Sequence, residues 1–158
     1  NGTTYFYVVS IASGAGQGST SAQVSAKPLQ TFGQWTAAAF PGETSAAVMG
    51  TSADPDHDGL QNLVEYYFGT SPSANTAGAL IGAASDGAGS IAFTYRMSKN
   101  LTGVAAKVQY STDLIGWTDN AALPTVVSDQ GDHYIMRSLV PTGGAPGLFL
   151  RLAVSTMP

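Results

Sequence analysis

The segment DPDHDGLQNLVE, residues 54–65, constrains the fold of this chain more than any other feature. It holds four of the chain's ten acidic residues, and the formal net charge of the whole chain is −4. Four carboxylates this close together repel one another unless a nearby positive charge neutralises them. The segment therefore either folds around a cation or remains an acidic turn in solvent, and we expect the first.

The spacing of the polar residues in this segment suits a hard divalent cation. It satisfies the pattern D-x-[DN]-x-[DN]-G-x5-E in full. Calcium takes roughly six to eight oxygen ligands, so alternating aspartates can wrap it, Gly59 permits the sharp turn, and the final glutamate can close the shell with both carboxylate oxygens. We predict a structural calcium site whose ligands are Asp54, Asp56, Asp58, the carbonyl of Leu60, the side chain of Asn62 or a water that it holds, and Glu65.

Two other positions in the segment argue against a zinc site and against a calcium switch. His57 is expected to point outward, and zinc is disfavoured because hard carboxylates surround this histidine and no second histidine is near in sequence. Gln61 occupies the position at which a sensor EF-hand carries an apolar residue that pairs with a second hand, and the sequence contains no second loop of this kind. We therefore expect a structural site and not a calcium switch.

Apolar residues at helical spacing indicate one short amphipathic helix before the loop and one at its end. The first covers residues 31–40, and Pro41-Gly42 follows as a stop signal. The second begins at Leu60, contains Glu65 and is capped by Gly69. Because this helix both supplies the closing glutamate and packs on the core, we expect metal binding and folding to be coupled. The apolar positions are Phe32, Trp35, Ala39 and Phe40 in the first helix, and Leu60, Leu63, Val64, Tyr67 and Phe68 in the second.

Residues 1–28 indicate a β-hairpin that needs a partner. Period-2 alternation over residues 5–11 and 20–26 flanks a glycine-rich turn. A two-stranded hairpin is marginal in water, so its apolar face needs cover from the rest of the chain, from an upstream segment or from another copy. The start at Asn1 is typical of a piece of a longer or processed polypeptide. If the chain is mature as it stands, we favour β-strand addition to another copy through Tyr5, Tyr7, Val9 and Ile11.

The C-terminal half indicates a β-sandwich. From Gly78 onward, short alternating segments are divided by Gly, Pro, Asn and Asp clusters, which favours antiparallel strands over βαβ units. The fold class we predict is mainly β: an antiparallel β-sandwich with an N-terminal β-hairpin and a short two-helix calcium-loop segment, with boundaries at 1–28, 29–77 and 78–158. Strands are expected at residues 79–84, 90–97, 104–110, 125–128, 133–140 and 148–154.

Composition and motifs exclude several functions. The chain has no cysteine, only six basic residues and no apolar run long enough for a membrane span, so disulfides, nucleic-acid binding and a transmembrane helix are not expected. No nucleophile motif such as G-x-S-x-G occurs. His133 lies near Asp129 and Asp132, but a polar loop before a strand accounts for this group. We expect no enzymatic activity.

Three parts of the chain resemble known extracellular modules. The run NGTTYFYVVSIASGAGQGSTSAQVSAKP resembles the last two strands of a fibronectin type III domain, with Tyr5 at the tyrosine-corner position, although the other five strands of such a domain are missing here. The calcium loop with its single helix resembles those of dockerins and thrombospondin type 3 repeats, and EYYFGTSP resembles the tail of bacterial extracellular modules of that kind. VQYSTDLIGW and LFLRLAV resemble the C-terminal β-domains of large secreted proteins from Verrucomicrobia-like and Planctomycetes-like bacteria.

These resemblances imply an extracellular or cell-surface location. The leading hypothesis is a structural protein: a calcium-stabilised subunit or terminal module of a bacterial surface filament or adhesin, assembling by β-strand complementation into a homo-oligomer or filament. The alternative is a carbohydrate-binding accessory module of a secreted polysaccharide-degrading enzyme. Trp117 and the tyrosines could form a platform for such a glycan, although a buried or turn-packing role for Trp117 is the commoner one.

Overall fold

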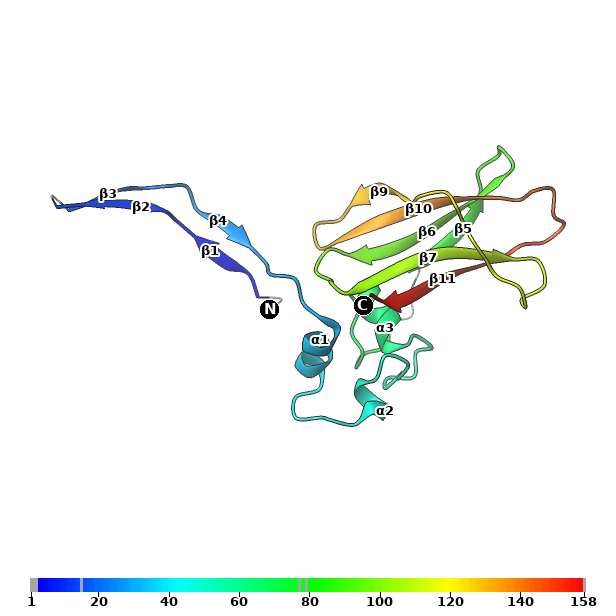
Figure 1. The fold of residues 1–158 in the computed structure, drawn as a ribbon, viewed down its shortest axis with the longest axis horizontal. Coiled ribbons are helices and arrows are strands. Elements are labelled where there is room, and N and C mark those ends of the chain that lie inside the picture. Colours follow the sequence, from blue (N-terminus) through cyan, green and yellow to red (C-terminus); the bar gives the residue numbers. More distant parts are fainter. Residues whose placement is uncertain (1–2, 15, 77, 79, 158) are drawn as a thin grey trace.

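The computed structural model describes residues 3–14, 16–76, 78 and 80–157. Along these residues the chain forms a two-stranded N-terminal arm, a segment of short helices and a β-sandwich (Figure 1). The mainly β fold predicted from the sequence is confirmed. None of the described helices is both long enough and apolar enough to cross a lipid bilayer.

The arm, residues 5–26, is the predicted hairpin, and it projects away from the sandwich (Figure 1). The prediction of one continuous strand over residues 5–11 was wrong, because the structure has two strands there. Val8 and Val9 separate these strands, and the pairing register shifts between Ser10 and Ala12. The regular alternation therefore joins Tyr5 and Tyr7 but does not continue evenly to Ile11. The arm consists of two antiparallel strand pairs. One is β1 (Tyr5–Tyr7) with β4 (Val24–Ala26), at the open end of the hairpin, and the other is β2 (Ser10–Ser13) with β3 (Gly16–Thr20), next to its turn.

The helices of the middle segment are set by local capping. Helix α1 (Phe32–Ala39) begins with a capping box, in which the Thr31 hydroxyl accepts from the Gln34 N–H at 3.3 Å and the Gln34 side chain accepts from the Thr31 N–H at 3.1 Å. Helix α3 (Asn62–Phe68) ends at Gly69, whose φ of 70° is the left-handed conformation expected of a glycine cap. A third helix, α2 (Ala46–Met49), has only one turn and was not predicted.

The sandwich consists of two antiparallel sheets with strand orders β5-β6-β10-β9 and β11-β7-β8. All six predicted strands are present with ends shifted by a residue or two, although Ala79, the expected start of the first, lies outside the described residues. The two-residue strand β8 was missed because it is too short to alternate. The bounds are β5 (Ile81–Ser85), β6 (Ser90–Ser98), β7 (Val104–Ser111), β8 (Thr118–Asp119), β9 (Thr125–Asp129), β10 (His133–Pro141) and β11 (Phe149–Thr156).

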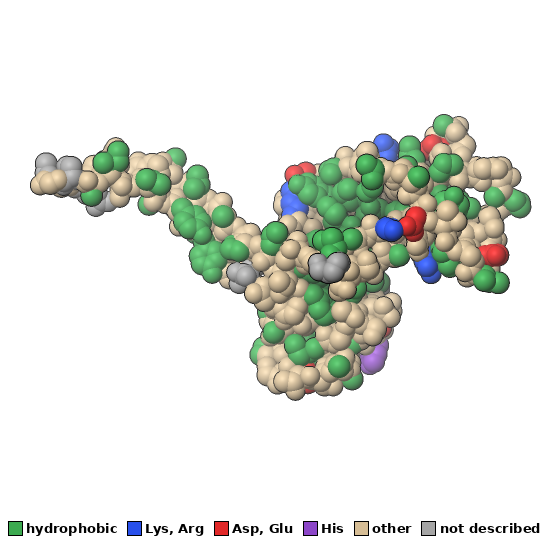
Figure 2. All heavy atoms as spheres, viewed as in Figure 1, with side chains coloured by type: hydrophobic (Ala, Val, Ile, Leu, Met, Phe, Trp, Pro, Cys, Tyr) green, Lys and Arg blue, Asp and Glu red, His purple; other side chains and the backbone are tan. Residues whose placement is uncertain are grey.

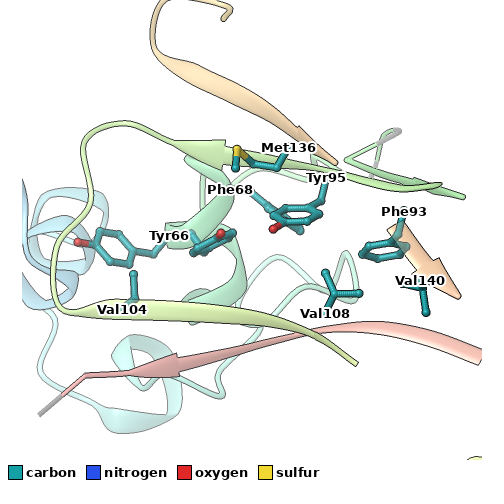
Figure 3. Packing of buried hydrophobic residues seen from close by; sticks show 9 residues of the cluster. Tyr66, Phe68, Phe93, Tyr95, Val104, Val108, Met136 and Val140 are labelled. Carbon is teal, nitrogen blue, oxygen red and sulfur yellow. The ribbon is translucent and has the colours of Figure 1, made fainter. Parts of the chain in front are cut away.

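One hydrophobic core joins helix α3 to the sandwich (Figure 3). Side chains from the inner faces of β6, β7 and β10 pack against aromatic side chains of α3, and the rings of Phe32 and Trp35 from α1 contact Tyr66. The helix that closes the acidic loop is therefore part of the sandwich core. The buried members are Tyr66, Tyr67, Phe68, Phe93, Tyr95, Val104, Val108, Met136 and Val140.

Candidate metal centre

The acidic loop is closed where helix α3 begins. The N–H of Asn62 donates to the carbonyl of Ala53 at 2.8 Å, and the N–H of Leu63 donates to that of Thr51 at 3.1 Å. Between these ends, His57 and Gly59 have φ values of 59° and 90°. Two left-handed residues in so short a segment curl the backbone inward, so side chains at alternate positions converge.

The structure brings the three aspartates of the loop together. One carboxylate oxygen from each of Asp54, Asp56 and Asp58 lies within 4.8 Å of the others. Ligands about 2.3–2.6 Å from a calcium ion lie at most about 5 Å apart, so this separation fits a shared ion. Each aspartate also accepts a backbone N–H of the loop: Gly59 to Asp54 at 3.1 Å, Asp58 to Asp56 at 3.3 Å, and Leu60 to Asp58 at 2.8 Å.

Four buried oxygens of the loop accept no hydrogen bond from the described residues. They come from four predicted ligands and are Asp54 Oδ1, Asp56 Oδ2, Asn62 Oδ1 and Glu65 Oε2. A buried polar atom without a partner costs roughly 1–3 kcal/mol, and more when it is charged. Four such atoms in one twelve-residue loop are explained together if one cation binds them all. We call them the four unpartnered oxygens.

Asn62 shows how the fold orients one of these atoms. This side chain is fully buried, and its Nδ2 donates to the carbonyls of Val48 at 2.7 Å and Gly50 at 3.0 Å. Both donor hydrogens of the amide are therefore used by the end of helix α2, which leaves the oxygen as the free end. The unpredicted helix α2 thus helps to position a predicted ligand.

Glu65 is the most deeply buried acid of the site. Its side chain is fully buried, and Oε1 accepts from the Thr70 hydroxyl at 3.3 Å. It lies outside the compact aspartate group, but burial, followed by the charges of Asp56, Asp58 and Asp54, raises the pKa of its carboxyl to about 7. A bound cation acts against each of these causes, because it favours the ionised carboxylate.

Thr76, which lies outside the loop, donates hydrogen bonds to Asp58. Asp58 Oδ2 accepts from the backbone N–H of Thr76 at 3.0 Å and from the Thr76 hydroxyl at 3.3 Å. Burial raises the pKa of Asp58, but the hydrogen bonds from Thr76 and Leu60 outweigh it, so the pKa lies below its usual value. Asp58 is therefore held ionised by the segment that follows helix α3. Sequence reasoning missed Thr76, because no spacing rule links a threonine eighteen residues away to the loop.

Of the remaining loop positions, Leu60 differs from its expected place, because helix α3 begins at Asn62 and not at Leu60. His57 is exposed, as the spacing predicts. Leu60 is half-buried and packs against the core, and its carbonyl stays a predicted ligand. Gln61 caps helix α3 through its backbone, and its side chain makes no cap hydrogen bond.

The four residues predicted to contact a partner are all exposed on the arm. Tyr5 is 44% exposed, Tyr7 50%, Val9 70% and Ile11 74%. Figure 2 shows hydrophobic side chains along the arm, away from the body of the molecule. Tyr5 therefore stands on the arm's surface, and the described residues build no sandwich around it as a tyrosine corner would require.

The residues considered for other functions make local contacts. Trp117 is half-buried, and the Arg151 guanidinium carbon lies 4.0 Å from the centre of its ring, so a charged group already covers one face of the indole. His133 Nδ1 lies 2.6 Å from the Asp132 carboxylate, and Lys99 pairs with Asp129. These local contacts account for the polar loop before β10.

Comparison of this chain with family models, with curated proteins and with solved structures gives no match. The resemblances to fibronectin type III, dockerin and thrombospondin type 3 modules therefore stay predictions. Any function has to be argued from the acidic loop, the arm and the sandwich themselves.

Proposed function

We propose that this chain is an extracellular structural module without catalytic activity, stabilised by calcium and assembling with other copies through its arm. In that role it would be a subunit or terminal module of a surface filament or adhesin. The observation that carries the calcium part is the set of four unpartnered oxygens in a loop whose spacing already fits that ion. The observation that carries the assembly part is the exposure of the apolar side chains of the arm.

The donor set favours calcium over other metals. All the candidate ligands are oxygens, and the one histidine of the loop is exposed, which disfavours zinc and copper. Magnesium keeps several waters and demands near-ideal octahedral geometry, whereas calcium accepts a larger and more flexible set of carboxylate and amide oxygens. A neutral amide and a buried glutamate beside three aspartates therefore suit calcium better than magnesium.

The metal is tested by titration after chelation. We expect isothermal titration calorimetry to show one calcium ion bound per chain, and Glu65→Gln to weaken that binding by at least tenfold. Asp119→Asn is the matched control, since it removes one negative charge from an exposed site that pairs with Lys107. Calcium binding that is equal in both variants would contradict the site, and so would an absence of calcium binding in the unsubstituted chain.

The arm supports self-association through its composition. Residues 1–26 contain no Asp, Glu, Lys or Arg, although 10% of the chain is charged. Native proteins usually protect exposed strand edges with charges, prolines or bulges, and the β1–β4 pair of the arm carries no charge, no proline and no register shift. A hairpin of this kind gains stability by adding to another sheet, where its backbone finds partners and its side chains are buried.

Assembly is tested by light scattering over a range of concentrations. We expect the chain to associate as its concentration rises and Tyr7→Asp to prevent this, because the substitution places a charge among the apolar side chains of the arm. Gln23→Asp is the control, since it adds the same charge to the arm between β3 and β4. An unsubstituted chain that stays monomeric throughout would refute self-association.

The glycan-binding alternative has weaker support. A sugar that stacks on Trp117 would have to displace or avoid the Arg151 guanidinium, and the ring contacts among the described aromatic residues lie in or beside the core. Glycan binding that is lost on Trp117→Ala would restore this alternative.

A further inference from the structure

An apolar groove runs along one side of the sandwich. It has a volume of about 400 Å³ and lies between the two sheets, where β5 and β6 face β11. Two of its residues are notably open to solvent for their size, Ile81 at 54% and Phe149 at 44% exposure. The other main lining residues are Ala83, Ile91, Phe93 and Leu148.

Both sheets are open at this groove. Among the described strands, β5 is one edge of the four-stranded sheet and β11 is one edge of the three-stranded sheet. β5 has the sequence IGAAS, which contains no charge and no proline, and β11 contains a single charged residue, Arg151. Strand edges that stay in water are usually protected by charged residues or prolines. The unprotected β5 edge therefore favours pairing with another strand.

The same chain carries an element that matches this surface. In the arm, Tyr5 pairs with Ala26 and Tyr7 pairs with Val24, so one face of the β1–β4 ladder presents two aromatic rings and a valine. The outer edges of β1 and β4 have no further strand among the described residues. The arm points away from its own sandwich (Figure 1), so it does not cover its own groove.

We propose that the groove between β5 and β11 receives the arm of a second copy of this chain. One strand of the incoming arm extends the four-stranded sheet along β5, and Tyr5 and Tyr7 enter the groove beside Ile81 and Phe149. This inference rests on the proposed self-association through the arm and names its acceptor. A volume of 400 Å³ is near the lower end for ligand pockets, so it holds a few side chains while the backbone pairs along the edge.

Charge supports a second copy as the occupant. The arm has no ionisable acid or base in residues 1–26 except Tyr5 and Tyr7, and the groove is lined by uncharged residues. Docking therefore removes no charged group from water, which is the costliest part of many interfaces. Because the donor and acceptor are different surfaces of one chain, each copy can donate and accept at once, so the contact propagates head to tail.

The test uses two full-length variants with complementary defects. Tyr7→Asp blocks the donor, and Ile81→Asp blocks the acceptor at a side chain that is more than half exposed. Each alone is expected to be monomeric by light scattering. An equimolar mixture is expected to give a dimer and nothing larger, because the intact arm of one variant fits the intact groove of the other. Val127→Asp, on the opposite edge of the same sheet, is the control and should associate like the unsubstituted chain.

The outcomes separate this inference from the proposal on which it rests. If Tyr7→Asp prevents association and Ile81→Asp does not, the arm mediates assembly but the groove is not its acceptor. If neither variant changes association, both ideas are overturned. The folded state of each variant is checked by circular dichroism.

A cross-link gives a second measurement that does not depend on a charged variant. The chain has no cysteine, so Val24→Cys, which lies opposite Tyr7 and keeps both tyrosines, and Ala83→Cys in separate chains create the only thiols in a mixture. We expect the mixed disulfide under mild oxidation in preference to either homodimer. A statistical mixture of the three disulfides would overturn the proposed docking.

Discussion

The hydroxyl oxygen of Tyr66 lies 2.8 Å from the backbone nitrogen of Thr102, from which it accepts a hydrogen bond across the junction between helix α3 and the sandwich. The same hydroxyl lies within hydrogen-bond reach of the carbonyls of Thr102, at 2.9 Å, and of Gln30. Its neighbour in the helix is Glu65, the most deeply buried acid of the candidate metal centre. The acidic loop and the sandwich are thus joined through two consecutive residues, so we expect them to unfold together.

Removal of calcium is expected to destabilise the whole module. Calcium at ten times its dissociation constant should stabilise the folded state by roughly 1.4 kcal/mol, which corresponds to about 3–6 °C in Tm for a domain of this size. Thermal unfolding followed by circular dichroism, with calcium and then with chelator, measures the difference. A Tm that is unchanged by chelator would show that the loop folds without the ion.

The buried charge of Glu65 predicts that removing this charge stabilises the fold when no calcium is bound. Since burial and the neighbouring aspartates raise the pKa of Glu65 to about 7, its ionised form is unfavourable in the calcium-free fold. Glu65→Gln should therefore stabilise the calcium-free protein above pH 7, by up to about 3 kcal/mol, and should remove the stabilisation by calcium. Urea unfolding with chelator and with calcium tests both effects. Destabilisation in chelator would contradict the electrostatic explanation.

The same pKa predicts a pH dependence with a definite sign. Below pH 4.5 Glu65 is protonated in both states, and between pH 4.5 and about 7 the unfolded chain releases a proton that the folded chain keeps. Stability of the calcium-free protein should thus fall as pH rises through this window. Urea midpoints at several pH values measure the slope, and Glu65→Gln should flatten it. The lowered pKa of Asp58 acts in the other direction, at lower pH.

Loss of the Tyr66 hydroxyl should weaken the junction between α3 and the sandwich. Tyr66→Phe leaves a part-buried N–H of Thr102 without its partner, which costs about 1–3 kcal/mol. Tyr134→Phe is the matched control, because it removes a hydroxyl from a half-buried ring in β10, away from this junction. Equal unfolding free energies for the two variants would mean that water replaces the tyrosine hydroxyl.

Two glycines should respond to alanine with opposite signs. Gly69 has a φ of 70°, and a Cβ there would lie 2.9 Å from the Ser98 Cβ, so Gly69→Ala should destabilise by about 1–2 kcal/mol. Gly33 lies in helix α1, and apart from its chain neighbours and the nearby helix backbone no described atom lies within 4 Å of the corresponding position. Gly33→Ala should therefore stabilise by about 0.5–1 kcal/mol. Chemical denaturation of the two variants, compared with the unsubstituted chain, checks both signs.

The sequence by itself determined the elements whose signals are local. The spacing of Asp54, Asp56 and Asp58, the glycine cap at Gly69 and the alternation in β6 and β7 each act over a few residues, so they can be recognised without neighbours. Helix α2 and strand β8 were not predicted, because a single helical turn and a two-residue strand are too short to show a hydrophobic period.

Only the tertiary structure decided which groups became buried and which stayed open. The contacts of Asp58 with Thr76, of Asn62 with Val48 and of Tyr66 with Thr102 join residues 14 to 36 positions apart. The groove between β5 and β11 likewise depends on which strands became sheet edges. Such contacts follow from how whole elements pack against one another, and hydrophobic packing between them is not directional, so no local residue pattern specifies it.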